Sequence, residues 1–408
     1  MARPLNSRSS AGGTTRRTAV GLILGAPLLG ACSGVQQSLS QFTGGSSDAP
    51  GPQQQPLAVG TGQVKVGLIL PLSATGNAAV AAQSMRNAAE MALAEFNNPD
   101  LQLLVKDDGG TAQGAQQVAQ QVLDEGAEII LGPLFALTVG PVGRAARARN
   151  VPVIAFSTDA NVAARGVYLL SFLPESDVER IIGYAASQGR RSFAALIPDN
   201  AYGSVAEGAF KQAVARRDGR VVALERYPAD KAKMQAPVKT VAQAAMGASR
   251  ADAIFIPDGA DGVPTVVQIL IANGVDPKRV QLLGTGLWED AQIFSNPPLD
   301  GAWYAGPDST GFRNFSGRYR SRYGQDPVRT ASLAYDAVAL VAALVKTQGQ
   351  QRFSESVLTT GSGFTGIDGL FRFRPDGTNQ RGLAVMKVSP TGGQIISAPP
   401  KDFAGSGT

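Results

Sequence analysis

The spacing of hydrophobic residues predicts short buried strands that alternate with amphipathic helices. Residues 64–71 form an apolar run typical of a buried strand, and residues 77–97 carry apolar side chains at helical spacing. The alternation continues with strands expected at 101–110, 128–131 and 151–156 and with helices expected at 112–125 and 138–149. Such alternation is typical of a parallel sheet that helices cover on both faces.

A second series of helices and strands begins after the break at Leu173-Pro174-Glu175. Helices are expected at 176–188, 203–217, 233–247 and 262–273, and strands at 192–197, 220–227, 253–256 and 281–284. A long helix at about 330–348 follows, and then a β-hairpin that turns at Asp376-Gly377. The pattern therefore predicts a second α/β unit of similar size.

The composition excludes several classes of function. The 408 residues include no histidine, which rules out Ser-His-Asp and Cys-His catalysis and every histidine-ligated metal site. Cys32 is the single cysteine, so no intramolecular disulfide can form. The net charge of +5 comes largely from four arginines within residues 1–31, so the remaining chain is nearly neutral and a nucleic-acid partner is not expected. We expect no cofactor, no metal site and no enzymatic activity.

The amino-terminal segment has the layout of a secretory signal peptide. Arg16 and Arg17 precede an apolar run at 19–29, which is too short to span a membrane. The sequence Leu29-Gly30-Ala31-Cys32 resembles a bacterial lipobox, in which Cys32 would be lipidated. A plain signal peptide with an incidental cysteine is the alternative, and the export route stays open. Ser33 follows the cysteine, which favours the outer membrane over the inner one for a lipid-anchored periplasmic protein.

Several motifs resemble, in order and spacing, those of a known family. They are GLILPLSATG at 67–76, DDGG at 107–110, ILGPL at 130–134, VPVIAFST at 151–158, PDNAYGSVAEGAF at 198–210, YGQDPVRTASLAYDAVAL at 323–340 and GIDGLFRFRPDGTNQRGLAVMKV at 366–388. Together they resemble the type I periplasmic binding proteins of the leucine/isoleucine/valine-binding branch. The resemblance implies an α/β fold of two Rossmann-like lobes with a ligand cleft between them.

The resemblance and the break in the pattern together give the expected boundaries. They are a lipoprotein signal peptide at 1–31, a flexible tether at 32–63, a first lobe at 64–173 plus about 305–348, a second lobe at 174–304 plus about 349–392, and a flexible tail at 393–408. The chain would cross between the lobes three times, near 172–175, near 304–307 and within 345–366.

The resemblance also implies which residues line the cleft. In the family, a hydroxyl residue holds the carboxylate of the ligand, and its position falls at Ala136, or at Thr138 if the loop is shifted. A second hydroxyl falls at Ala160, and the acid that pairs with the ligand's ammonium falls near Gly286. Tyr202 matches a tyrosine of the cleft. The candidate ligand-cleft residues are Ser73, Thr75, Gly76, Ala136, Thr138, Ser157, Thr158, Asp159, Tyr202, Trp288 and Glu289.

Two functions are compatible with these observations. The first is a non-enzymatic lipoprotein that resembles activators of penicillin-binding proteins, the synthases of peptidoglycan. The alternative is a solute-binding lipoprotein of an ABC importer for branched-chain amino acids, amides or a similar small solute. The partner would be a penicillin-binding protein synthase in the first case and an ABC permease in the second. Because Ala136, Ala160 and Gly286 lack the expected side chains, we predict that free leucine, isoleucine and valine do not bind at micromolar concentration.

Overall fold

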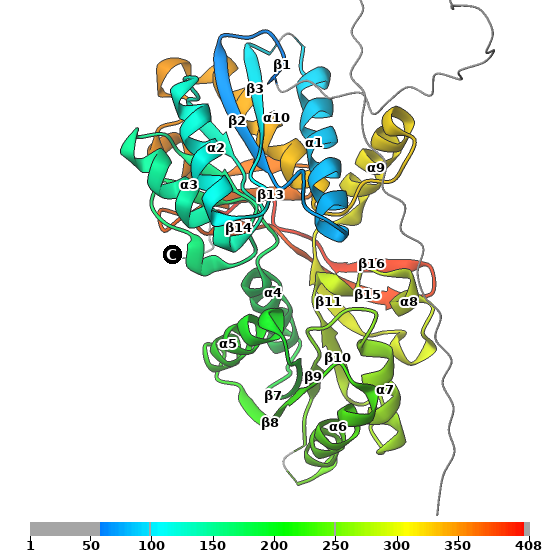
Figure 1. The fold of residues 1–408 in the computed structure, drawn as a ribbon. Coiled ribbons are helices and arrows are strands. Elements are labelled where there is room, and N and C mark those ends of the chain that lie inside the picture. Colours follow the sequence, from blue (N-terminus) through cyan, green and yellow to red (C-terminus); the bar gives the residue numbers. More distant parts are fainter. Residues whose placement is uncertain (1–57, 98, 249, 404–408) are drawn as a thin grey trace, which may run out of the picture. The chain divides into compact units, whose positions relative to one another are not determined.

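The computed structural model describes residues 58–97, 99–248 and 250–403. Within these residues, helices and strands alternate through two large sheets and one small sheet (Figure 1). The α/β class predicted from the hydrophobic spacing is confirmed. The expected signal peptide, the lipidation site at Cys32 and tether residues 32–57 lie outside the described residues.

The first sheet has six strands in the order β1-β3-β2-β4-β5-β6. All neighbours are parallel except β1, which pairs antiparallel with β3. The strands are β1 Ala58–Val59, β2 Val64–Leu70, β3 Leu101–Asp107, β4 Ile129–Leu131, β5 Val153–Ala155 and β6 Val167–Leu169. The helices that follow them are α1 Asn77–Glu95, α2 Ala112–Asp124, α3 Ala136–Ala148 and the 3-10 turn η1 Ala160–Val162.

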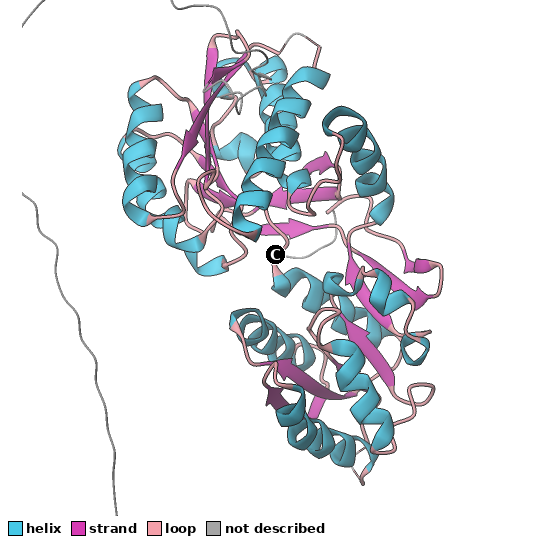
Figure 2. Cartoon of the chain, turned by 45° about the vertical axis from the view of Figure 1, so that its right-hand side comes forward, coloured by secondary structure: helices cyan, strands magenta, loops and turns pink. Residues whose placement is uncertain are grey.

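Helices cover both faces of this sheet because its central strands are apolar on both sides (Figure 2). On one face, Val122 of α2 and Val142 of α3 are fully buried. On the other face, Met85 of α1 packs with Val338 of α10, which spans Ala331–Thr347. Two separate apolar cores therefore hold the sheet in place.

The second sheet has seven strands in the order β16-β15-β11-β10-β9-β7-β8. The parallel strands are β7 Ser192–Pro198, β8 Arg220–Tyr227, β9 Ala253–Phe255, β10 Gln281–Gly284 and β11 Trp303–Gly306, and β15 Ala384–Ser389 and β16 Gly392–Ser397 are antiparallel. The helices are α4 Pro174–Ser187, α5 Ala201–Ala215, α6 Lys231–Met246, α7 Val263–Ala272, α8 Ala291–Phe294 and the turns η2 Gly286–Trp288 and η3 Pro297–Leu299.

The two large sheets share one strand order. In both, the first strand of the parallel set lies between the second and the third, as β2 lies between β3 and β4 and β7 lies between β8 and β9. Helices α4 and α5 cover one face of the second sheet, and α6 and α7 cover the other. We call each large sheet with its packed elements a lobe, the first containing β1–β6 and the second containing β7–β11.

A small antiparallel sheet packs on the first lobe. Its strands are β12 Phe364–Gly366, β13 Gly369–Phe373 and β14 Asn379–Arg381, and the last two form the predicted hairpin. Phe371 and Phe373 are buried in the core of the first lobe. Assigning about 349–392 to the second lobe was therefore wrong for residues up to 381. The third crossover runs between β14 and β15, not within 345–366, because the hairpin buries its aromatic side chains against the first sheet.

The remaining helices also belong to the first lobe. They are α9 Ser309–Tyr323, the turn η4 Gly349–Gln351 and α11 Glu355–Leu358. Phe315 and Tyr319 of α9 are fully buried. Asn87 of α1 donates its side-chain N–H to the Tyr319 hydroxyl at 3.0 Å. The aromatic residues of α9 therefore attach it to α1.

The expected flexible ends at 32–63 and 393–408 are partly ordered. At the first end, β1 pairs with β3 and covers the edge of the first sheet. At the second end, β16 pairs with β15, and the chain then returns to the first lobe, where Phe403 is 4% exposed. The Arg372 guanidinium lies 4.6 Å from the centre of the Phe403 ring.

No helix in the described part of the chain combines the length and the apolar character that crossing a membrane requires.

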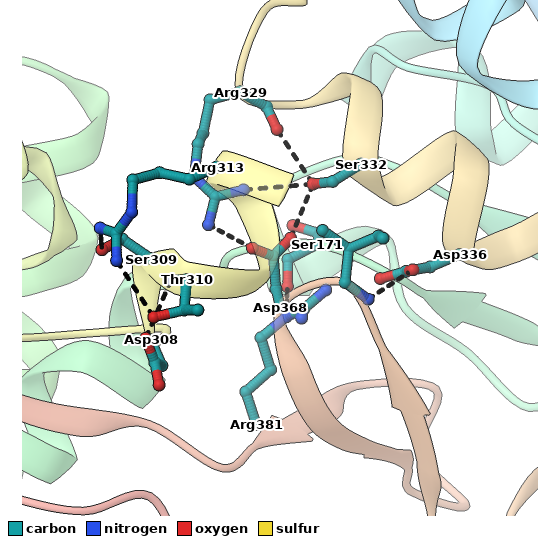
Figure 3. A network of polar contacts seen from close by, with 11 residues as sticks. Ser171, Asp308, Ser309, Thr310, Arg313, Arg329, Ser332, Asp336, Asp368 and Arg381 are labelled. Atoms are coloured by element: carbon teal, nitrogen blue, oxygen red, sulfur yellow. Dashed lines mark hydrogen bonds and ion pairs between the residues drawn. The ribbon is translucent and has the colours of Figure 1, made fainter. Parts of the chain in front are cut away.

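A buried polar network lies beside the crossovers (Figure 3). Asp368 pairs with Arg329 and accepts a hydrogen bond from the Ser332 hydroxyl at 2.6 Å. Arg381, the last residue of β14, donates from Nε to the Ser171 carbonyl at 2.9 Å. The network thus links the segment before the third crossover to the segment before the first.

Candidate functional site

The carboxyl ends of the parallel strands define one edge of each lobe at which a site is expected. In doubly wound sheets, ligands bind outside these ends, where the strand order reverses. The reversal lies between β2 and β4 in the first lobe and between β7 and β9 in the second. The first crossover joins the two edges, because it leaves the carboxyl end of β6 and enters α4, whose first turn contacts the loop after β10.

Three elements of the second lobe bring polar groups together at this edge. Tyr202, in the first turn of α5, donates its hydroxyl to Thr285 Oγ1 at 2.9 Å. Thr285 follows β10 and is fully buried. Asp177, in the first turn of α4, accepts the Gly286 N–H through Oδ2 at 2.9 Å. These four residues, called the second-lobe cluster below, are joined across as many as 109 sequence positions.

Local sequence explains how the cluster is held. Pro174 begins α4, where the missing N–H of proline costs nothing, and acids in that first turn face the positive end of the helix. Asn200 caps α5 by accepting the Gly203 N–H at 2.8 Å, which places Tyr202 in the first turn. A Cβ at position 286 would lie 3.2 Å from Asp177 Oδ2, so glycine there leaves room for the carboxylate.

The cluster holds a poorly compensated negative charge. Burial raises the pKa of Asp177 to about 7, although the Gly286 amide, Arg381 and Arg329 act in the opposite direction. Burial also raises the pKa of Tyr202, and the charge of Asp177 adds to this shift. Among the described residues, Asp177 makes no ion pair. Its carboxyl group therefore titrates near neutral pH.

Polar groups at the first-lobe edge are bonded within their own loops or to a neighbouring strand. The Thr138 hydroxyl donates to the Phe135 carbonyl at 2.8 Å, and the Ser157 hydroxyl accepts the Asp159 N–H at 3.1 Å. Ser73 donates its N–H to Asp107 at 3.2 Å. Of these bonds, only that of Thr138 engages a hydroxyl as a donor, so the hydroxyl of Ser157 can still donate.

Two helices at the same edge start without a side-chain cap. Gly76 precedes α1 and Phe135 precedes α3, and neither makes a capping side-chain bond. Ser73 and Thr75 beside the first helix are exposed, and so is Thr158 in the loop after β5. The free amides at these two helix starts are donors that a polar solute group can use.

Three of the predicted cleft residues are used elsewhere. Trp288 is fully buried in the core of the second lobe, and Gly284 lies against its ring. The carboxylate of Glu289 accepts the hydroxyl of Tyr304, which lies in the same core. Thr138 is fully buried at the start of α3. Each of the three is therefore held by structural contacts, and their assignment to the ligand cleft stays a prediction.

Sequence reasoning missed Asp177 and Thr285, and it missed one glycine pattern. Asp177 reaches Gly286 only through tertiary structure, and no local pattern along the chain indicates that contact. Residues 361–366 have the G-x-G-x-x-G spacing of a dinucleotide site. They end in β12, which continues into β13 and not into a helix, so the pattern does not form such a site. Among the described residues, no group of three or more potential metal ligands gathers.

Two hollows lie on the first lobe beside α3. One, of about 750 Å³, lies between α3, β6 and residues 353–355. The other, of about 570 Å³, includes Ala136 and Leu137 at the start of α3. All lining residues of both hollows come from the first lobe, so neither hollow contains the second-lobe cluster.

Comparisons with known proteins agree on the fold. The family model described as "Periplasmic binding protein" matches residues 63–394. A structure from Rhodospirillum rubrum described as a branched-chain amino acid ABC transporter is 20% identical, with a TM-score of 0.72, over 82% of this chain and 99% of that chain. A comparison with curated protein sequences gives no match.

Two further solved structures were determined with a ligand. The solute binding protein of an ABC transporter from Rhodopseudomonas palustris BisB5, in complex with 3,4-dihydroxybenzoic acid, is 20% identical with a TM-score of 0.59, over 83% and 98% of the two chains. The ABC transporter substrate-binding protein from Desulfitobacterium hafniense, in complex with Leu, is 17% identical with a TM-score of 0.60. The match covers 82% of this chain and 99% of that chain.

The match to the family model covers most of the chain, so the protein belongs to the periplasmic binding protein family. Its fold is that of the type I members, with two mixed sheets of common strand order. The family consists of solute-binding proteins, not enzymes.

Proposed function

We propose that this protein is the solute receptor of an ABC importer and binds a small solute between the carboxyl edges of its two lobes. The second-lobe cluster is the observation that carries the proposal. It gathers a carboxylate, two hydroxyls and a backbone amide from three elements at the carboxyl edge of the second sheet. Convergent polar groups of this kind fix the orientation of a bound solute.

Exposed apolar side chains beside these loops also support a binding surface. Val80 of α1 and Leu137 of α3 are each 58% exposed, and Leu287 of η2 is 45% exposed. All three lie within the first turns that follow the carboxyl edges. Large apolar side chains exposed near polar anchors are typical of surfaces that contact a ligand or a partner.

The comparisons support the importer over a role in peptidoglycan synthesis. The three solved structures reported above are all described as parts of ABC transporters, and two of them hold a small solute. The hypothesis of a penicillin-binding protein activator has no such support. We infer that the partner is an ABC permease and that the protein acts in the periplasm.

The test is a thermal-shift screen of the purified protein against a library of small solutes, followed by calorimetric titration of each hit. A receptor is stabilised by about 2.7 kcal/mol when the free solute is a hundredfold above its Kd. An activator of a synthase requires no solute. A library that covers amino acids, amines, aromatic acids and sugars and gives no stabilising solute contradicts the proposal.

A pair of matched variants locates the binding site. Tyr202→Phe removes the hydroxyl that bonds to Thr285, and it should weaken solute binding about tenfold. Tyr184→Phe is the control, since Tyr184 packs edge-on against Trp303 in the same lobe, away from the cluster. Equal affinities for both variants would place the site elsewhere.

We also propose that Cys32, outside the described residues, carries the lipid that anchors the protein, with the outer membrane favoured. Cys32→Ser should abolish labelling by a radioactive fatty acid. Labelling of that variant at the level of the natural protein contradicts the lipobox interpretation.

A further inference from the structure

The carboxyl edges of both lobes are acidic. Ten parallel strands end at these edges, and the segments that lead from them to the next helix contain seven acidic residues and no lysine or arginine. The acids are Asp108, Asp159, Asp199, Asp230, Asp258, Asp261 and Asp308. Clefts lined by one sign of charge concentrate solutes of the opposite sign.

Helix capping accounts for part of this charge. Asp159, Asp230 and Asp308 each accept a backbone N–H of the following turn at 2.9–3.0 Å. Such caps are common without any ligand, so composition alone does not define a substrate. The contacts of the remaining acids at these edges therefore decide whether a positively charged ligand is indicated.

Two buried carboxylate oxygens at these edges are unsatisfied. Asp108, at the first-lobe edge, is 1% exposed, and its Oδ2 has no hydrogen-bond partner among the described residues. Glu175, which shares the first turn of α4 with Asp177, likewise has an Oε2 atom without a hydrogen-bond partner among the described residues. Burial raises the pKa of both groups. An incoming positive charge would lower the cost of keeping these groups ionised.

Asp177 has the geometry of an anchor for such a charge. Its Oδ2 is fixed by the Gly286 N–H at 2.9 Å, while Oδ1 has no partner among the described residues. The two arginines that act on its charge are already engaged, because Arg329 pairs with Asp368 and Arg381 donates to the Ser171 carbonyl. A fixed carboxylate with one free oxygen suits a charge-assisted hydrogen bond from an ammonium group.

We propose that the solute is an organic cation with a primary ammonium group, an apolar body and no free carboxylate, and that Asp177 binds the ammonium group. The inference rests on the proposed function and names the substrate class of the same site. Val80, Leu137 and Leu287 supply the apolar contacts.

A free carboxylate is disfavoured at the first-lobe edge. The Thr138 hydroxyl, a candidate donor, is bonded to the Phe135 carbonyl, and the charge of Asp108 lies next to it. The backbone amides at the starts of α1 and α3 and the exposed hydroxyls of Thr75 and Thr158 remain as donors, but the segments at this edge contain no lysine or arginine. Amides without a nearby cation hold a carboxylate weakly beside a buried negative charge.

Matched pairs of probes test this substrate class by calorimetric titration. The pairs are 3-methylbutylamine with 3-methylbutanoate, benzylamine with benzoate, and leucinamide with leucine. Within each pair that binds, the amine or amide should bind more than tenfold more tightly than the carboxylate. A carboxylate that binds as tightly as its partner overturns the inference and leaves the proposed function standing.

Two variants test the role of Asp177. Asp177→Asn keeps an acceptor for the Gly286 N–H but removes the charge, and it should weaken binding of the amines at least tenfold. Asp261→Asn is the control, because Asp261 is an exposed acid in the loop after β9 and its loss removes the same charge. Asp261→Asn should weaken binding of the amines less than twofold. Equal effects of the two variants, or none, would overturn the assignment of Asp177.

The role of Asp177 can also be tested without a solute, by thermal unfolding at different pH values. The pKa of Asp177 is raised from 3.8 to about 7 in the folded protein, so its ionised form destabilises the fold. Asp177→Asn should therefore melt at a higher temperature than the natural protein at pH 8, and the difference should shrink as the pH falls from 7 towards 4. A variant that melts lower at every pH would show that Asp177 is a structural acceptor, contrary to the inference. Failure of every solute in the library would instead contradict the proposed function.

Discussion

The two lobes share a strand order but use the polar side chains at their carboxyl edges differently. In the first lobe, Thr138 bonds to a carbonyl three residues away and Ser157 to an amide two residues away. In the second lobe, Tyr202 and Asp177 bond to the loop after β10 across 83 and 109 positions. Local bonds shape a single loop, whereas the long-range bonds assemble groups from separate elements. Under the proposed function, the second lobe would therefore provide most of the polar recognition.

The two lobes also differ in how each compensates a buried carboxylate. Asp368, in the first lobe, is fully buried and has two partners, Arg329 and Ser332. Asp177, in the second lobe, is held by one backbone amide and makes no ion pair with any residue that the structure describes. A compensated charge stabilises the fold, and an uncompensated one weakens it until a ligand arrives.

The largest expected effect comes from removing the compensated charge. Asp368→Ala removes the fully buried partner of Arg329, whose side chain is 38% exposed, and leaves the Ser332 hydroxyl without its acceptor, so it should cost about 1–3 kcal/mol of unfolding free energy. Asp326→Ala removes an exposed partner of Arg320 and should cost less than about 1 kcal/mol. Urea unfolding measures both. Similar losses of unfolding free energy in the two variants would contradict the expected difference between buried and exposed ion pairs.

The branched-chain amino acids provide the second test. Free leucine, isoleucine and valine should not bind at micromolar concentration, because alanine stands at positions 136 and 160, where the resemblance places the hydroxyls that hold their carboxylate. Asp177 supplies an acid beside Gly286, where the sequence alone indicated none. The zwitterion would therefore be satisfied at one end only. Calorimetric titration that gave a saturable isotherm with any of the three would show that the first lobe binds carboxylates after all.

A smaller effect is expected at Thr138. Thr138→Val removes the hydroxyl bond to the Phe135 carbonyl in a buried site, so stability should fall by about 1 kcal/mol. Affinity for any bound solute should stay within twofold, because the hydroxyl faces the helix start. Thr158→Val, at an exposed position of the same edge, should change stability little. A tenfold loss of affinity in Thr138→Val would return this residue to the ligand site.

The hydrophobic spacing predicted most elements because their periodicity is local. The expected strand at 220–227 coincides with β8, and the helix expected at 330–348 is α10 within one residue at each end. The strand β6 was missed, although β4 and β5 are equally short and were predicted. The predicted boundary of the second lobe was wrong because sequence spacing does not indicate which lobe's core the aromatic residues of the hairpin enter. The structure places Phe371 and Phe373 in the core of the first lobe.

The site was less predictable than the fold. Tyr202 was found through its motif, and the structure places it beside Thr285. Asp177 was not found, because only the folded chain brings α4 to the loop after β10. Trp288 and Glu289 were chosen for their closeness in sequence to Gly286, but residues adjacent in a turn point in different directions. Trp288 enters the core and Glu289 bonds to Tyr304.

The central claim is that an ionised Asp177 binds the solute's ammonium group. The charged and titratable groups that act on Asp177 are Tyr202 on α5 and Arg329 and Arg381 from the first lobe, with Glu175 on the same helix acting on Tyr202 as well. Asp336 also titrates near 7, but it lies beside Arg381 and Asp368 and is common to the natural protein and its variants.

The most direct test is therefore the pH dependence of affinity for the tightest-binding amine, compared between the natural protein and Asp177→Asn. Because the pKa of Asp177 is about 7 in the folded protein, affinity should be constant above that pH. Below it, affinity should fall towards tenfold per pH unit as protons compete with the amine. The variant should bind weakly with no such slope. An affinity of the natural protein that stays constant from pH 5 to pH 8, or an equal slope in the variant, would contradict the claim.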